Sequence, residues 1–269
     1  MAIGLSTYAF FWRASSRVSK PLSIEAMLEE CAELGAGVFQ ICDHPAVETL
    51  SSQRLEKLRL RAEELDVELE LGTRGIGRAP LDRYLDLAEP LGVSLLRSML
   101  YSADHRPTTL EARKLLSEAV PRFEARGVRL ALETYEQVPS AVLVELVERI
   151  DSPFLGICLD PGNCVAALER PVDVIDACAA RVFNLHVKDF AFSRRDGWVG
   201  FTFAGCPLGE GLLDYAYLHQ RIRPQARGIN QIVEHWLPWQ TDEATTCRLE
   251  AEWTRHCLDY LKTYPSVAH

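Results

Sequence analysis

Four residues that can bind a divalent metal ion each lie at or near the end of a short apolar segment. They are Glu133 in VRLALE, Asp160 in LGICLD, His186 in VFNLHVKD and Glu234 in INQIVE. Three carboxylates with one imidazole favour Mn²⁺ or Mg²⁺, with Zn²⁺ and Co²⁺ as alternatives. A lone acidic residue at a strand end is usually a solvated cap, so a metal site is predicted only if the fold brings all four residues together.

A metal ion held by these residues would polarise a carbonyl group and stabilise an enediolate. Glu133 and Glu234, on opposite sides of the ion, would then act as base and acid. Isomerisation or epimerisation follows if both groups reach the substrate. Decarboxylation or dehydration follows from the same stabilised charge if the substrate is an oxidised sugar acid. The residues alone leave both outcomes open.

Eight strand-like segments alternate with eight helix-like segments along the chain. The strands are predicted over residues 3–7, 37–42, 67–72, 93–98, 128–133, 154–160, 182–188 and 229–234, and the helices over residues 23–35, 51–65, 80–91, 108–126, 139–149, 168–180, 212–223 and 242–262. This order predicts an α/β fold in which residues 1–269 form a single (β/α)8 TIM barrel. A doubly wound open sheet is the alternative.

The alternation of side chains along the predicted strands supports an axial metal site. Successive side chains of a strand point to opposite faces. Glu133 shares its face with Ala131, and His186 shares its face with Asn184, whereas bulky residues such as Phe183 take the opposite face. We therefore expect the ligands to face the barrel axis at the carboxyl ends of the strands, where active sites of such barrels are built.

Residues 189–211 are long for a connection between a strand and a helix. They contain Asp196-Gly197 between segments rich in aromatic residues, which is a hairpin signal. Long connections in compact domains are often functional. We therefore expect an inserted active-site loop, with a small hairpin, after the seventh strand.

Composition restricts the class of protein. The formal charge of −9 and the scattered basic residues argue against nucleic acid as a partner. No apolar run reaches the roughly 20 residues that span a bilayer, so no membrane association is expected. The eight cysteines form no C-x-x-C pair, and the apolar N-terminus has no basic residue ahead of it. These features predict a cytoplasmic protein with reduced thiols.

The four ligand segments resemble those of the xylose isomerase-like TIM-barrel superfamily, which includes ketose 3-epimerases and the endonuclease IV barrels. The matching pieces are LALET at 130–134, GICLDPGN at 156–163, NLHVKD at 184–189 and IVEHW at 232–236. The resemblance implies metal binding by the four candidate ligands and proton transfer by the two glutamates. It also implies a small carbohydrate substrate and a homo-oligomer, a dimer or a tetramer.

Five further residues are candidates for substrate binding. Lys188 is in phase with His186, and Arg97, Trp12 and His235 lie at or just beyond strand ends. Asn163 replaces a histidine that the family often has three residues after the aspartate. This departure puts the epimerase substrate in doubt.

Two enzyme hypotheses follow, and the isomerase is favoured. The first is a metal-dependent isomerase or epimerase of a keto-sugar or sugar acid. The alternative is a metal-dependent lyase, a decarboxylase or dehydratase, of an oxidised sugar acid such as a 3-oxo acid. Asn163 and the loop at 189–211 motivate this alternative. A DNA-repair nuclease and a non-enzymatic binding barrel are disfavoured.

Overall fold

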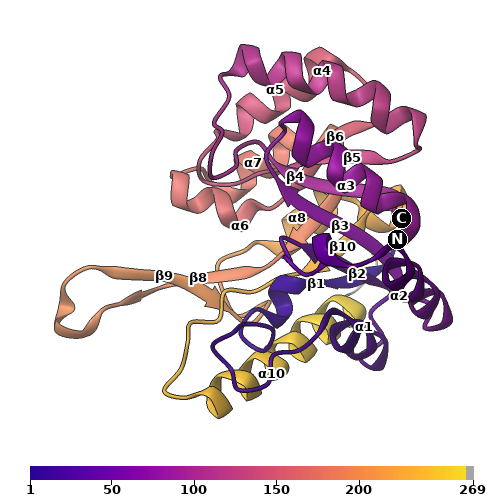
Figure 1. Ribbon diagram of the computed structural model, residues 1–269. Coiled ribbons are helices and arrows are strands. Elements are labelled where there is room, and N and C mark those ends of the chain that lie inside the picture. Colours follow the sequence, from indigo (N-terminus) through magenta and orange to yellow (C-terminus); the bar gives the residue numbers. More distant parts are fainter. Residues whose placement is uncertain (265–269) are drawn as a thin grey trace.

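The computed structural model describes residues 1–264, in which parallel strands close into an eight-stranded barrel surrounded by helices (Figure 1). The barrel strands are β1 Ile3–Ser6, β2 Val38–Cys42, β3 Glu68–Arg74, β4 Leu95–Met99, β5 Arg129–Glu133, β6 Leu155–Leu159, β7 Val182–Val187 and β10 Asn230–Val233. Their order around the barrel is β1-β10-β7-β6-β5-β4-β3-β2. The predicted TIM barrel is confirmed.

The outer helices follow the predicted segments closely. They are α1 Ile24–Glu33, α2 Ser52–Glu64, α3 Arg78–Leu91, α4 Thr109–Ala125, α5 Ser140–Ile150, α7 Pro171–Cys178, α8 Tyr215–Ile222 and α10 Glu243–Thr263. The Ser23 side chain accepts the N–H of Ala26 to cap α1, and Gly35 follows that helix with a left-handed φ of 67°. Two four-residue helices, α6 Pro161–Cys164 and α9 Pro224–Arg227, escaped prediction because one turn carries no periodicity.

The side-chain alternation of β7 is interrupted at its start, which corrects one prediction. Phe183 was expected to face the helices, but it packs with the cluster of Leu95, Ala131 and Cys158. The pairing of β6 with β7 shifts register between Ile157 and Cys158, so an extra β7 residue enters the ladder. Such a bulge changes which face a side chain takes. His186, beyond the bulge, keeps its predicted face.

A two-stranded hairpin follows β7, as predicted, and projects from the barrel (Figure 1). It consists of β8 Asp189–Arg194 and β9 Phe201–Cys206. At its base, the Asp189 carboxylate accepts backbone N–H groups from Phe190, Gly209, Gly211 and Leu213. These four hydrogen bonds fix the path of the chain at the mouth of the barrel.

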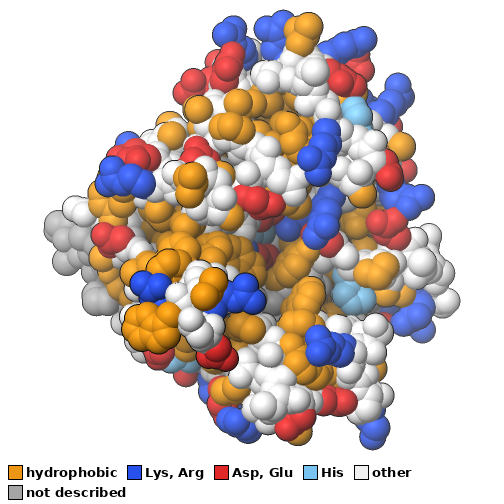
Figure 2. Space-filling view, turned by 90° about the vertical axis from the view of Figure 1, so that its left-hand side faces the viewer, with side chains coloured by type: hydrophobic (Ala, Val, Ile, Leu, Met, Phe, Trp, Pro, Cys, Tyr) orange, Lys and Arg blue, Asp and Glu red, His pale blue; other side chains and the backbone are white. Residues whose placement is uncertain are grey.

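The outer part of the hairpin lies in solvent. Phe192, Trp198 and Phe201 are exposed, and Arg194 lies over the rings of Trp198 and Phe201. Figure 2 views the molecule from the side toward which the hairpin projects, and it shows hydrophobic side chains beside Lys and Arg side chains on this face. Only the base of the predicted active-site loop therefore lies close to the barrel.

Two further features bear on the class of protein. Among residues 1–264, no helix combines the length and the apolar character that crossing a membrane requires. All eight cysteines are free thiols, and six of them are buried.

Candidate metal centre

The four predicted ligands meet at the carboxyl end of the barrel. One donor atom from each of Glu133, Asp160, His186 and Glu234 lies within 4.8 Å of the others, and all four residues are buried. They come from the ends of four neighbouring strands, β5, β6, β7 and β10, or directly follow them. The predicted convergence of these strand ends is therefore present.

The Nδ1 atom of His186 faces all three carboxylates. It lies 3.4 Å from Oε1 of Glu133, 3.5 Å from Oε1 of Glu234 and 3.7 Å from Oδ2 of Asp160. Ions bound at about 2.1 Å hold neighbouring ligand atoms roughly 3 to 3.5 Å apart. Within the described residues, Nδ1 of His186 and Oδ2 of Asp160 have no hydrogen bond of regular geometry although they are buried. The donor set and its spacing fit one divalent ion.

Two buried basic residues adjoin the carboxylates. The Lys188 ammonium lies 2.7 Å from Oδ2 of Asp160 and 2.7 Å from Oε2 of Glu234. The Arg97 guanidinium lies 2.5 Å from Oε2 of Glu133. Burial alone would raise the pKa of Glu234, but His186, Lys188 and Arg97 outweigh it and lower that pKa. The glutamate is therefore ionised at neutral pH, as a metal ligand must be.

Uncharged hydrogen-bond donors contact the remaining carboxylate oxygens. The Asn163 amide donates to Oε1 of Glu133 at 3.0 Å, and its backbone N–H donates to Oδ1 of Asp160 at 3.2 Å. The Ser6 hydroxyl donates to Oε1 of Glu234 at 2.8 Å. Asn163 thus contacts two predicted ligands from the first turn of α6.

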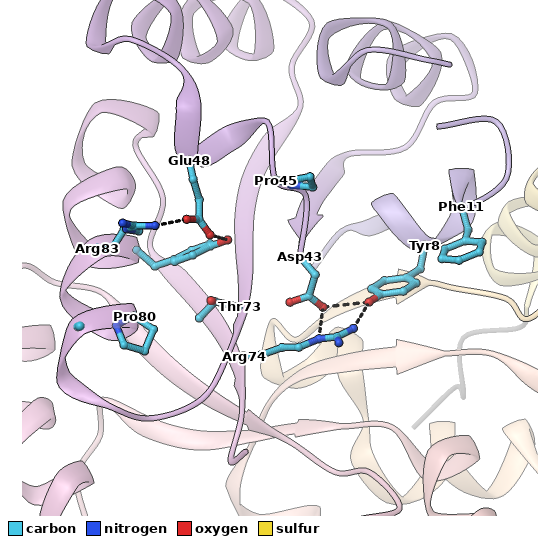
Figure 3. Close-up of a pocket in the computed structure, with 11 residues that line it drawn as sticks. Tyr8, Phe11, Asp43, Pro45, Glu48, Thr73, Arg74, Pro80 and Arg83 are labelled. Carbon is cyan, nitrogen blue, oxygen red and sulfur yellow. Dashed lines mark hydrogen bonds and ion pairs between the residues drawn. The ribbon is translucent and has the colours of Figure 1, made fainter. Parts of the chain in front are cut away.

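A cavity of about 760 Å³ lies over the ends of β2 and β3 (Figure 3). Tyr8, Asp43 and Arg74 point toward one another in it. The Tyr8 hydroxyl donates to Oδ2 of Asp43 at 3.0 Å, and the Arg74 guanidinium donates to that hydroxyl at 2.7 Å. Thr73 and Arg83 also line the cavity. Hydroxyl, carboxylate and guanidinium groups of this kind suit a polyhydroxylated or anionic ligand.

Asp43 connects this cavity to the ligand cluster. Its Oδ2 atom lies 3.2 Å from Nη1 of Arg97, the same guanidinium that contacts Glu133. Asp43 has a φ of 50°, which is uncommon for a residue with a side chain. Unfavourable backbone conformations of this kind gather at functional sites. Asp43 is therefore a candidate site residue.

Two predicted substrate-binding residues, Trp12 and His235, line a side cavity of about 230 Å³ that shares Tyr8 and Phe11 with the first cavity. The Trp12 indole N–H donates to the carbonyl oxygen of Leu237 at 2.6 Å. The His235 ring contacts the Thr254 hydroxyl of α10, and burial is the main cause that lowers its pKa to about 4. The structure therefore brings Arg97, Asn163 and Lys188 to the ligand cluster and places Trp12 and His235 outside it.

The sequence reasoning missed Tyr8, Gln40, Asp43 and Arg74. Tyr8, Asp43 and Arg74 have a usable signal, because each lies one or two residues beyond the end of a predicted barrel strand. Gln40 lies inside its predicted strand and has no such signal. Its partner His186 lies far away in the sequence, and only the closed barrel brings the two residues together.

Two sequence relationships accompany this geometry. The family model described as xylose isomerase-like TIM barrel matches residues 28–262. A 3-oxo-isoapionate decarboxylase from Pectobacterium atrosepticum is 63% identical over 263 residues, which cover 98% of this chain and 96% of that protein.

Solved structures share the fold at low sequence identity. A D-psicose 3-epimerase from Clostridium cellulolyticum, solved with D-tagatose, has a TM-score of 0.72 at 15% identity and covers 97% of each chain. The IOLI protein, solved with a zinc atom, has a TM-score of 0.72 at 15% identity, over 99% of this chain and 100% of that one. At such identities the likeness establishes the fold alone.

Proposed function

This chain belongs to the xylose isomerase-like TIM barrel family, and we propose that it is a metal-dependent decarboxylase of a 3-oxo sugar acid. Its 63% identity to a 3-oxo-isoapionate decarboxylase carries the proposal. The buried cluster of three carboxylates and one imidazole supports it. The isomerase or epimerase reaction that the sequence favoured is not confirmed, and the relative supports the lyase alternative.

The metal is proposed to be Mn²⁺ or Mg²⁺, held by Glu133, Asp160, His186 and Glu234. One such ion would supply positive charge beside the ketone oxygen of the substrate. Oxygen-rich donor sets suit these hard ions, and one imidazole also admits Zn²⁺ or Co²⁺.

The residues of this chain supply the rest of the proposed mechanism. The bond between the carboxylate and the carbon next to the ketone breaks, CO₂ leaves, and the bonding electron pair passes into the resulting enolate. Lys188 and Arg97 lie beside the ligand cluster, where their charges stabilise the negative oxygen. One proton must then replace the carboxylate on carbon.

Lys188 is the proposed donor of that proton. Burial alone would lower its pKa, but Asp160, Glu234 and Glu133 raise it, so the side chain is protonated at neutral pH. A carbon-bound proton of a hydroxyketone is a far weaker acid than an ammonium group, so transfer to carbon is downhill. Glu133 contacts Arg97 and Glu234 contacts Lys188, and these contacts orient the two basic side chains toward the reacting carbon. If the enzyme also exchanges the new carbon-bound proton with solvent, the two glutamates act as acid and base.

The remainder of the substrate is proposed to occupy the cavity in Figure 3. Tyr8, Asp43 and Arg74 offer both donors and acceptors to hydroxyl groups. Asn163, which donates to Glu133, would contact the end of the substrate nearest the cluster.

The direct test is CO₂ release. Purified protein, stripped with a chelator and reloaded with Mn²⁺, is incubated with 3-oxo-isoapionate and with other 3-oxo sugar acids. We expect stoichiometric CO₂ and a hydroxyketone product that depend on the added ion. Keto-sugars without a carboxylate are the matched controls, because an epimerase converts them without loss of mass. Isomer exchange without CO₂ release would exclude the decarboxylase.

A further inference from the structure

A chain of buried polar side chains lies in the barrel below the ligand cluster. Its members are Gln40 on β2, Glu70 on β3 and Asn184 on β7, and each is at most 1% exposed. Buried polar groups are costly unless they are hydrogen-bonded. Their retention in a barrel interior calls for a physical reason, which the contact of Gln40 with His186 provides.

Gln40 contacts the imidazole ring on the side opposite the carboxylates. Its Oε1 atom lies 2.8 Å from Nε2 of His186. A carbonyl oxygen only accepts hydrogen bonds, so Nε2 carries the hydrogen in this contact. In the neutral ring the other nitrogen, Nδ1, then has a free lone pair. That nitrogen faces Glu133, Asp160 and Glu234.

Glu70 determines which way the Gln40 amide points. Nε2 of Gln40 donates to Oε2 of Glu70 at 2.9 Å and to Oδ1 of Asn184 at 3.1 Å. A flipped amide would set its carbonyl oxygen against these acceptors and its NH₂ against His186. The Cys42 thiol also donates to Oε1 of Gln40, at 3.0 Å. Both ends of the amide are therefore held in one orientation.

Amide groups hold Glu70 as an acceptor. Its two oxygens accept from Gln40, from Asn184 at 3.0 and 3.3 Å, and from Asn230 at 2.9 Å. All of these donors are side-chain NH₂ groups. The direction of donation therefore runs consistently from His186 through Gln40 to Glu70.

We propose that Gln40 and Glu70 are positioning residues that fix the tautomer of His186, so that Nδ1 faces a divalent ion. This inference rests on the metal site of the proposed function. Hydrogen-bonded partners of metal-binding histidines orient the ring and strengthen its binding. Glu70 acts from a distance, because it contacts Gln40 and not the imidazole.

The test compares two buried glutamines. Gln40→Met removes the acceptor for Nε2 of His186 with little change of volume. Gln231→Met is the matched control, because Gln231 is also 1% exposed and in a barrel strand but bonds to the Tyr215 hydroxyl. Mn²⁺ binding to chelator-stripped protein is measured by calorimetry. We expect Gln40→Met to weaken binding by about 10- to 100-fold and Gln231→Met by less than about threefold.

Rescue and spectroscopy separate positioning from general damage to the fold. Gln40→Glu places a second carboxyl group beside Glu70, and because the two cannot both be ionised, they share a proton that takes the place of the amide hydrogen. The oxygen toward Nε2 of His186 remains an acceptor, so we expect this variant to bind Mn²⁺ within about threefold of wild type. In the Zn²⁺-loaded protein, the ¹⁵N signals of His186 should show a protonated Nε2 in wild type and in Gln40→Glu. If Gln40→Met does not fold, Glu70→Gln replaces it, with the same expected direction.

The outcomes distinguish the two proposals. Wild-type protein that binds no divalent ion would refute the proposed metal site. Wild-type protein that binds Mn²⁺, together with Gln40→Met of equal affinity, would refute the positioning role and leave the metal site intact. Weaker binding in Gln40→Met with rescue by Gln40→Glu supports the inference.

Discussion

The ammonium nitrogen of Lys188 lies 2.7 Å from Oε2 of Glu234, and both side chains are almost completely buried. A second carboxylate, that of Asp160, lies at the same distance from the ammonium. The Trp236 ring, 4.7 Å from the ammonium, covers another side of it. Lys188 is therefore held as a cation between two predicted metal ligands, next to where the substrate would bind.

Lys188→Met is expected to lower kcat by at least about 100-fold, because it removes the proposed proton donor. It also leaves two buried carboxylates unpaired, which costs about 3–5 kcal/mol of stability in comparable pairs. Added Mn²⁺ should offset part of that loss. The measurements are steady-state kinetics and Tm with and without Mn²⁺.

Lys57→Met is the control for that substitution, because Lys57 is exposed on α2. It should leave kcat and Tm unchanged. Full activity in Lys188→Met would contradict the role assigned to the ammonium group.

Asp160→Asn is expected to abolish tight metal binding. The Asp160 carboxylate faces His186 and is completely buried. Loss of a ligand charge should cost more than the roughly 10- to 100-fold that an outer partner costs. Calorimetry with Mn²⁺ measures the effect, and Asp173→Asn on the exposed surface of α7 is the control. Unchanged affinity in Asp160→Asn would remove this residue from the ligand set.

The ligand set was predictable from sequence because each ligand depends on local rules. Strand ends and the two-residue alternation suffice to aim Glu133 and Glu234 at the barrel axis. The same rule failed at Phe183, because a bulge depends on how β6 pairs with β7. Gln40 was missed because its partner His186 is 146 residues away. The local sequence pattern thus predicts the strand face on which a metal ligand lies. Only the tertiary structure shows which residues form hydrogen bonds with that ligand.

Trp12 shows a different limit of the sequence. It lies near the end of the first strand, yet its backbone N–H donates to the Glu250 carboxylate of α10 at 2.7 Å and its ring lies in the side cavity. A residue near a strand end faces the site only if the connection that follows turns toward it. Here the hydrogen bond to Glu250 on α10, near the C-terminal end of the chain, fixes the direction of that connection.

Glu250 should make stability depend on pH. Burial is the main cause that raises its pKa, and hydrogen bonds from Trp12 and Arg13 oppose the shift only in part. A raised folded pKa means that the folded state binds the proton more tightly than the unfolded state. The contribution of Glu250 to stability is therefore full below about pH 4.3, the unfolded value, and is lost as pH rises through the folded value.

Glu250→Gln removes this titration. The free energy of unfolding in urea, measured between about pH 4 and pH 8, should fall less with rising pH in Glu250→Gln than in wild type. The comparison uses slopes, because the amide also weakens the contacts with Arg13 at every pH. Equal slopes in the two proteins would contradict the raised pKa of Glu250.

Asp43→Asn is expected to weaken substrate binding more than metal binding. Asn tolerates the left-handed backbone of this position, so the substitution removes charge without adding strain. The Asp43 carboxylate holds Tyr8 and Arg74 in the cavity and Arg97 beside Glu133. Without that charge, KM should rise by about tenfold, as expected for the loss of one charged hydrogen-bonding group. Mn²⁺ affinity should stay within about threefold, since Asp43 is not a ligand.

Asp104→Asn, at an exposed loop position, controls for the change in net charge. If KM is unchanged while Mn²⁺ affinity falls, Asp43 supports the ligand cluster through Arg97 and the cavity is not the substrate site.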